Sequence, residues 1–242
     1  MSDTANRHSN KSTIEMIKLG INVTIPIMLG YIPVAITFGI LAKQAGMSIF
    51  ELTMMSAFVY AGASQFMGAN MIASSASVVE IIVATFVLNF RHFIMSLSFM
   101  NQVQSEIGTK NRFLLSLGLT DETFAVTSLH IEQNKEEKGF IFFMTVTIAA
   151  YLSWILGTLL GGVLGEAIPE QLSQSMGIAL YALFIGLLVP PLKQNVRLII
   201  IVVIAMCVNY FFSYFISSGW SIVLGTLFGG LSGVILLKGE SK

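Results

Sequence analysis

One apolar stretch, residues 78–100, restricts the fold most, because it carries charges inside a segment long enough to cross a bilayer. Arg91 lies near its middle, beside His92 and two residues after Asn89. An arginine at the centre of a membrane helix costs about 2.5–3.5 kcal/mol even on lenient scales. Glu80 and Arg91 lie ~20° apart around a helix, so one face carries both charges. That face must contact protein, water or a counter-charge rather than lipid.

The composition indicates an integral membrane protein. Hydrophobic residues make up 55% of the chain and charged residues 11%, whereas soluble domains average about 25% charged. The formal net charge is zero, which argues against nucleic-acid binding. Cys207 is alone, so we expect no disulfide or metal site, and no cofactor. We also expect no cleaved signal peptide, because the first apolar run is too long and lacks a clean cleavage site.

Eight apolar runs lie between a polar N-terminal tail, residues 1–15, and a charged C-terminal tail, residues 238–242. We therefore expect an all-α polytopic membrane helical bundle of about eight spans over residues 16–237. The predicted runs are 16–42, 52–73, 78–100, 113–130, 140–164, 172–189, 196–216 and 220–237. Pro26 and Pro33 predict a kink or break in the first run. Small and polar residues at 60–66 favour either a packing seam or a local unwinding in the second.

Two glycine-rich segments, residues 156–165 and 224–233, share the pattern L-G-T-L-x-G-G-x-x-G. They belong to the fifth and eighth runs, which cross in opposite directions in an eight-span chain, as an inverted repeat requires. A chain rich in glycine and leucine could also produce this match by chance. The pattern therefore predicts close packing seams first and an inverted repeat second.

Lysines and arginines in the links predict the orientation, because cytoplasmic links are enriched in them. Eight spans with a cytoplasmic N-terminus place nine positive residues inside and three outside. A seven-span chain, in which residues 113–130 do not cross and the N-terminus lies outside, gives the same ratio. We favour eight spans in the cell inner membrane, with the N-terminus in the cytoplasm. Three positive residues flank the first run on its N-terminal side and one follows it.

The polar residues inside the apolar runs are the candidate functional residues. The structural alternative is an ion pair that only fixes helix register, since buried pairs add little net stability. Inside membranes, however, such residues often mark substrate paths or proton relays. We expect Arg91 and one of Asp121 or Glu122 to form a polar centre. The candidate substrate-binding residues are Arg91, Asn89, Gln65, Asp121, Glu122 and Ser64, and the candidate proton-coupling residues are His92, Asp121 and Glu122.

A site of this kind would suit a zwitterion with an apolar tail. A broken helix offers free amides to a carboxylate, and nearby acids or carbonyls suit an ammonium group. The 18 phenylalanines and 13 methionines make an adaptable apolar lining plausible. Most of them must face lipid or fill the core, so composition alone does not select a substrate.

Four motifs stand on these runs in a specific order and spacing. They are Gly30-Tyr31-Ile32-Pro33 with Phe38-Gly39, Tyr60-Ala61-Gly62-Ala63-Ser64-Gln65-Phe66, Asn89-Phe90-Arg91-His92 and Thr120-Asp121-Glu122-Thr123-Phe124. With them the chain resembles the AzlC family, the large subunit of two-component branched-chain amino acid exporters, over roughly residues 20–237. The resemblance implies export of leucine, isoleucine, valine and often methionine, driven by a proton gradient or the membrane potential. It also implies a small hydrophobic AzlD-type partner.

Two other classes of function stay open. A channel or a non-transporting scaffold subunit would have the same composition and the same runs. An intramembrane hydrolase would use Ser64 or Ser96 with His92, but the sequence lacks a nucleophile elbow and a zincin motif. We therefore expect a transporter that works by alternating access and not an enzyme.

Overall fold

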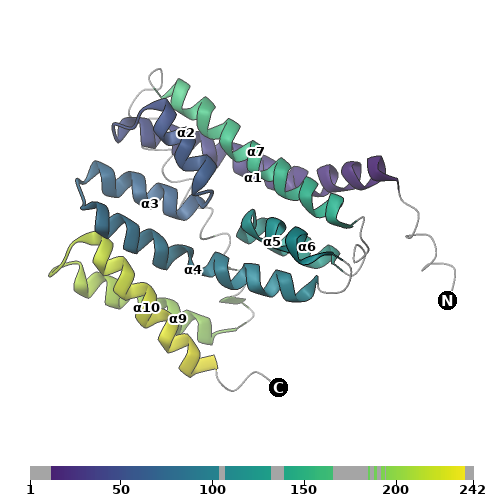
Figure 1. The fold of residues 1–242 in the computed structure, drawn as a ribbon. Coiled ribbons are helices and arrows are strands. Elements are labelled where there is room, and N and C mark those ends of the chain that lie inside the picture. Colours follow the sequence, from purple (N-terminus) through teal and green to yellow (C-terminus); the bar gives the residue numbers. More distant parts are fainter. Residues whose placement is uncertain are drawn as a thin grey trace.

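The computed structural model describes residues 12–103, 107–131, 139–165, 185, 188–189, 192–193 and 195–237. Every element in these ranges is helical (Figure 1), which confirms the all-α membrane bundle. The helices are α1 (Thr13–Gln44), α2 (Ile49–Phe58), α3 (Gly62–Ala73), α4 (Val78–Gln102), α5 (Thr109–Leu117), α6 (Asp121–His130), α7 (Gly139–Leu164), α9 (Arg197–Phe212) and α10 (Ser218–Leu237). Four of them, α1, α4, α7 and α10, are long and apolar enough to cross a membrane. The predicted run 172–189 lies almost wholly outside the described residues.

Helix α1 begins within the segment expected to be a polar tail. The Ser12 hydroxyl accepts a hydrogen bond from the Glu15 amide at 3.3 Å, and the Glu15 carboxylate accepts one from the Ser12 amide at 2.7 Å. This reciprocal cap fixes the start of the helix. From there α1 continues unbroken past Pro26 and Pro33, so the break predicted for the first run is absent.

Helices α1 and α7 form a tightly packed pair (Figure 1). A Cβ at Gly39 would lie 2.2 Å from the Thr158 carbonyl oxygen, and one at Gly161 would lie 2.1 Å from the Ile36 carbonyl oxygen. The packing seam predicted over residues 156–165 is therefore confirmed. Near the other end, a Cβ at Gly20 would lie 2.8 Å from Cβ of Thr145. Residue numbers increase in the same direction along α1 and α7 at these contacts, so the two helices run parallel.

The second predicted run folds as a hairpin, α2–α3. Helix α2 starts beside the C-terminal end of α7, where the Leu52 side chain meets Gly162, and ends in the middle of the bundle. Helix α3 then returns along α2. The Gln65 side-chain amide lies 2.8 Å from the Ser56 hydroxyl, and a Cβ at Gly68 would meet the Met55 side chain. The hairpin thus returns to the end at which it entered.

The fourth predicted run folds as a second hairpin, α5–α6, which enters from the opposite end. At its base, the Arg112 guanidinium donates to the Met100 carbonyl of α4 at 3.2 Å. Further in, the Ser96 hydroxyl donates to the Ser116 carbonyl at 2.8 Å. Helix α6 then runs back until His130 lies against the ring of Phe142, with 5.6 Å between ring centroids. In the described chain between α1 and α7, α4 is the helix that passes from one end to the other.

Helices α9 and α10 pair with each other, and α10 lies against α4 (Figure 1). A Cβ at Gly225 would lie 3.0 Å from the Ala205 carbonyl oxygen, which confirms the seam predicted over residues 224–233. The Glu80 carboxylate accepts hydrogen bonds from the Ser217 hydroxyl and from the Gly219 amide, the latter at 3.1 Å. Since Val223 packs with Ala84, α10 runs in the direction of α4 and opposite to α7. The two glycine-rich segments therefore run in opposite directions, as expected from their places in the sequence.

Candidate functional site

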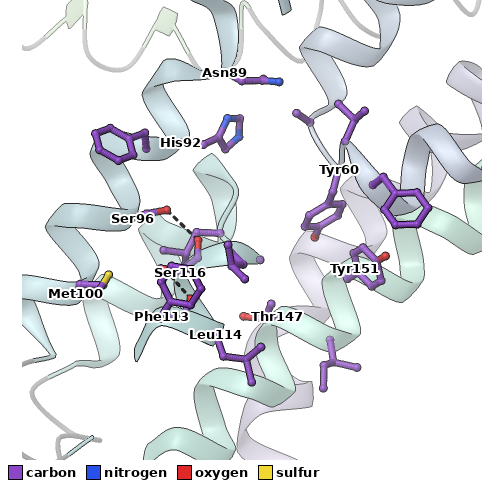
Figure 2. Close-up of a pocket in the computed structure, with 18 of the residues that line it drawn as sticks. Tyr60, Asn89, His92, Ser96, Met100, Phe113, Leu114, Ser116, Thr147 and Tyr151 are labelled. Carbon is purple, nitrogen blue, oxygen red and sulfur yellow. Dashed lines mark hydrogen bonds between the residues drawn. The ribbon is translucent and has the colours of Figure 1, made fainter. Parts of the chain in front are cut away.

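A cavity of about 740 Å³ lies between α4 and α7, where both hairpins reverse direction (Figure 2). Tyr60 and Ala61 at the tip of α2–α3 form one part of its wall. Ser116 and Gly118 at the tip of α5–α6 form another. This volume falls within the range of about 300–1,000 Å³ that small-molecule sites occupy. The tips of two hairpins from opposite ends of the bundle therefore meet at one cavity, which is open on part of its wall.

The cavity lining is mostly apolar with a few polar groups. The apolar side chains include Phe93, Leu97, Phe113, Leu114, Met144 and Ile148. Asn89, His92 and Ser96 supply polar atoms from α4, facing Tyr60 and Tyr151 across the space (Figure 2). Such a lining suits a small molecule with an apolar body and a few polar atoms.

Tyr60 has an unusual backbone at the tip of α2–α3. Its φ is +42°, which side-chain-bearing residues rarely adopt and which tends to occur at functional positions. The side chain is 9% exposed, and its hydroxyl has no hydrogen-bond partner among the described residues. Its ring meets Tyr151 edge-on at 4.9 Å, whereas the Tyr151 hydroxyl donates to the Ala57 carbonyl at 2.8 Å. The two tyrosines therefore differ, since one hydroxyl is engaged and the other is free.

Gln65 lies behind the cavity wall and is fully buried. Its amide nitrogen donates to the Ser56 hydroxyl at 2.8 Å, and its oxygen accepts from the Trp154 indole nitrogen at 2.9 Å. Ser56 is in turn 2.8 Å from the Thr158 hydroxyl. This chain of neutral hydrogen bonds joins α2, α3 and α7 and holds the tip of the hairpin in place.

Ser64 and Asn89 join the same hairpin to α4. The buried Ser64 hydroxyl donates to the side-chain oxygen of Asn89, which lines the cavity. The Ser96 hydroxyl also lies on the cavity wall but is bonded to the Ser116 carbonyl. Both serines considered as nucleophiles therefore donate to groups other than His92.

Charged residues gather at the tip of the α5–α6 hairpin. Arg91 Nη1 lies 3.0 Å from the Asp121 carboxylate, with the two side chains 38% and 29% exposed. The neighbouring Glu122 instead accepts from the Tyr31 hydroxyl at 2.6 Å. Of the two adjacent acids, Asp121 is thus the one that pairs with Arg91. Both lie in the first turn of α6, where the helix dipole favours negative charge.

Thr120 completes this tip by capping α6. Its hydroxyl accepts from the Thr123 amide at 3.3 Å and lies 2.6 Å from the Tyr31 hydroxyl. The Thr123 hydroxyl accepts in return from the Thr120 amide at 2.8 Å. The first turn of α6 therefore carries a side-chain cap and two carboxylates.

Sequence reasoning gave no role to Tyr31, Tyr60, Tyr151 or Trp154. Tyr31 and Tyr60 lie within the quoted motifs, and the small residues after Tyr60 marked a place where the helix could unwind. Tyr151 and Trp154 carried no comparable signal, because aromatic residues are common in apolar helices. Glu80, in contrast, lies away from this site, where it binds the start of α10.

The part of the chain that forms the cavity has recognisable relatives. Residues 26–168, more than half of the chain, match the family described as AzlC protein. The chain belongs to the AzlC family. The match covers the described helices α2 to α7 and most of α1, and therefore both hairpins, Arg91 and Asp121.

Individual relatives support this membership. An uncharacterized membrane protein of Archaeoglobus fulgidus is 33% identical over 185 residues, or 75% of this chain and 79% of the relative. Inner membrane protein YgaZ of Escherichia coli K12 is 30% identical over 139 residues, 57% of each chain. The branched-chain amino acid transport protein AzlC of Bacillus subtilis is 29% identical over 136 residues, 55% of this chain and 52% of the relative.

Several matches cover only part of the relative. The alignment with YgaZ spans 57% of that protein, and the alignment with a Helicobacter pylori membrane protein, 36% identical, spans 58% of it. No solved structure matches the chain. The chain is thus a multi-pass membrane protein of an AzlC family that includes an amino acid transport protein.

Proposed function

We propose that the chain is the carrier subunit of an exporter of branched-chain amino acids, with methionine as a further substrate. The cavity carries the proposal, because it lies between the tips of hairpins that enter from opposite ends. Broken or re-entrant helices within a membrane occur where they are buried in protein or line a cavity, and in transporters they form the substrate site. The amino acid transport protein of Bacillus subtilis among the relatives supports the choice of substrate.

The positions of the hairpins support the proposal of alternating access. Each hairpin lies between the cavity and one end of the bundle, so moving one hairpin opens the cavity toward one side only. Helix α4 contacts both, through Asn89 to Ser64 on α2–α3 and through Arg91 to Asp121 on α5–α6. These contacts are within a single turn of α4, so a shift of this turn acts on both hairpins.

The proposed residue roles divide between the two hairpins. Arg91 and Asp121 hold the α5–α6 hairpin closed, while Asn89 and Ser64 shape the substrate wall. Gln65 acts from behind that wall, since both ends of its amide are already bonded. Protonation of Asp121 would remove its charge and release Arg91, which would couple a proton to opening. Glu122 and His92 are the other groups proposed for proton coupling.

Efflux from loaded cells tests these roles. Cells given a leucine-containing dipeptide accumulate leucine, whose efflux is then followed with the wild type, Arg91→Ala and Asp121→Asn. We expect at least a tenfold slower carrier-dependent efflux in both variants at equal amounts of membrane protein. The matched control is Arg112→Ala, which removes an arginine bound at the base of the hairpin to Met100 and Thr109. Normal efflux in Arg91→Ala would remove the ion pair from the mechanism.

A channel or scaffold subunit remains the rival function. Carriers exchange substrate, so unlabelled leucine inside vesicles accelerates entry of labelled leucine, whereas a channel gives no such trans-stimulation. The chain, with its AzlD-type partner where the two co-purify, is reconstituted for this measurement. Leucine flux without trans-stimulation would favour the channel, and absence of any flux would favour the scaffold.

A further inference from the structure

The segments α1–α3 and α4–α6 contain the same order of elements. Each begins with a long helix, continues into a helix that stops inside the bundle, and ends with a helix that returns from there. The N-cap of α3 is Ala61 and that of α6 is Thr120, 59 residues later. Shifting α2 and α3 by this spacing places them on α5 and α6 within two residues at each end. Since α1 and α4 run in opposite directions and the hairpins enter from opposite ends, the two segments are related as an inverted repeat.

The repeat relates the two tips that meet at the cavity. Residues 57–60 of the first hairpin line it, and residues 116–119 of the second, which are their equivalents, line it as well. The two long helices do not match in this way. Helix α4 lines the cavity from Asn89 to Met100, toward the end at which α5–α6 enters. The cavity therefore extends from the tips toward that end of the bundle.

The equivalent face of α1 is packed instead. Phe38 corresponds to Leu97, which lines the cavity, yet Phe38 is fully buried. Val34 corresponds to the cavity-lining Phe93 and is only 7% exposed. The ring of Phe38 meets that of Phe66 on α3 edge-on, with 5.5 Å between centroids. This face of α1 thus belongs to a buried apolar cluster that it shares with α2, α3 and α7.

We propose that the packed face of α1, where it meets α3, is the second half of the solute path. In this structure the half along α4 is formed, and the half along α1 is filled by Phe38, Phe66 and their neighbours. An inverted repeat can exchange two such arrangements, since each repeat can adopt the structure now seen in the other. This inference rests on the proposed function and specifies where the path of the amino acid continues. The apolar wall of the filled half suits the solute's apolar side chain.

Separating α1 from α3 would open the filled half. Pro33 lies at the start of the packed face and removes one backbone hydrogen bond of α1, so the helix can bend there. The side-chain hydrogen bonds of Gln65 join α3 to α2 and α7 and not to α1, so they can persist. Apolar surface exposed in one half would be buried in the other as α5–α6 closes on α4, which offsets the cost of the separation.

Cysteine labelling distinguishes the two halves. In the full chain with the exposed Cys207 replaced by alanine, Val34→Cys reports on the filled half. Ser96→Cys reports on the formed half, because Ser96 lines the cavity. Each purified variant is reacted in detergent with a small water-soluble methanethiosulfonate, and the rate of labelling is measured. We expect Ser96→Cys to react roughly tenfold faster than Val34→Cys, since the reagent must reach the thiol.

Loss of one ring should shift the balance between the two halves. Phe66→Ala removes the ring at the contact between α1 and α3, so it weakens the packing of the filled half. We expect Val34→Cys to react roughly tenfold faster in this variant and Ser96→Cys roughly twofold more slowly, because one half forms at the expense of the other. The matched control is Phe99→Ala, which removes a similarly buried ring that meets Phe143 edge-on at 5.6 Å, away from this path. The control should leave labelling of Val34→Cys slow.

The outcomes distinguish this inference from the proposed export. Labelling of Val34→Cys that stays slow in Phe66→Ala, or that rises equally in Phe99→Ala, would overturn the second half of the path. Labelling of Ser96→Cys that does not slow would show loosening alone and would overturn it too. Phe66→Leu, which keeps an apolar side chain but loses the ring, repeats the comparison if the alanine variant fails to fold.

Leucine exchange in vesicles is measured on the same preparations. Reciprocal changes in labelling without leucine exchange would refute export and leave the two-part path standing. Exchange without the reciprocal changes would overturn the path and leave export standing.

Discussion

The two hairpins have the same shape but are held by different chemistry. Hydrogen bonds between uncharged, buried groups hold α2–α3, chiefly those of Gln65 with Ser56 and Trp154. At the tip of α5–α6, contacts of carboxylates are added to the bonds at its base, since Asp121 meets Arg91 and Glu122 meets Tyr31. Neutral buried bonds do not change when a proton binds, whereas carboxylate contacts do. This difference suits a bundle with one fixed hairpin and one that responds to protons.

The two helix starts at the tips differ in the same way. Helix α6 begins with a Thr120 cap and carboxylates in its first turn, so its positive end already has its counter-charges. Helix α3 begins with Ala61, which lines the cavity, and has no side-chain cap, so its positive end has no side-chain counter-charge in its first turn. The hairpin held by neutral bonds is therefore the one whose helix starts without a cap or a charge.

The largest expected effect is all-or-none labelling at the two hairpin bases. In a Cys207→Ala background, a maleimide that cannot cross membranes is added to intact cells carrying Ser74→Cys or Lys110→Cys. Lys18, Lys110 and Arg112 lie at the end where α5–α6 enters, and Lys43 lies at the other. The end of the bundle with more lysine and arginine residues should be cytoplasmic. We expect Ser74→Cys to react and Lys110→Cys to stay unlabelled.

Opened cells provide the control, since both cysteines should then react. An eight-span chain with a cytoplasmic N-terminus places residues 101–112 outside, because residues 16–42, 52–73 and 78–100 each cross. Labelling of Lys110→Cys in intact cells, at the level of Ser74→Cys, would therefore contradict two re-entrant hairpins.

The second-largest expected effect is the loss of stability when the buried hydrogen bonds of Gln65, which anchor α2–α3, are removed. Gln65→Leu preserves approximate volume but leaves the Trp154 indole and the Ser56 hydroxyl without their partner. We expect the free energy of unfolding to fall by about 3 kcal/mol, measured by denaturation in detergent. The matched control is Gln102→Leu, whose amide donates to Ser98 at the exposed end of α4 and should change stability by less than about 0.5 kcal/mol. Equal losses of unfolding free energy in the two variants would contradict the anchoring role of Gln65.

Most of the helices were predictable from the sequence because apolar runs of bilayer length determine them. The third run, 78–100, became α4, and the fifth, 140–164, became α7, each within two residues at either end. The glycine seams were predictable for a similar reason, since close helix packing requires small residues at regular spacing. The membrane bundle follows from these features alone.

The hairpins could not be predicted, because hydropathy measures length and not direction. A run such as 52–73 has the same composition whether it crosses or turns back at its middle. The charged site was partly predictable. Polar atoms in apolar runs must find partners, which selected Arg91 and an acid of the fourth run, but the choice of Asp121 over Glu122 depends on the angle at which α6 starts. Tyr60 was missed because its free hydroxyl is visible only in three dimensions.

The third prediction compares glycines at the two tips. An alanine at Gly62 would place its Cβ 2.9 Å from the Trp154 indole, which cannot move without losing its bond to Gln65. An alanine at Gly118 would meet Cγ2 of Thr147, a methyl that can rotate toward the cavity. We expect losses of about 2 kcal/mol at Gly62 and about 1 kcal/mol at Gly118 in the free energy of unfolding. Gly108→Ala, with open space around the residue, is the control. A larger loss of unfolding free energy at Gly118 than at Gly62 would contradict this prediction.

The smallest effect is at the capped start of α6. Thr120→Val keeps the shape of the side chain but removes the hydroxyl that caps α6 and meets Tyr31. Because the carboxylates of Asp121 and Glu122 still satisfy the positive helix end, we expect a loss of only about 1 kcal/mol in the free energy of unfolding. Hydrogen exchange should become faster in α6 and stay unchanged in α3. Thr226→Val, which removes an exposed hydroxyl bonded only within α10, is the control. Faster exchange in both hairpins would show that they open together and would refute their independent anchoring.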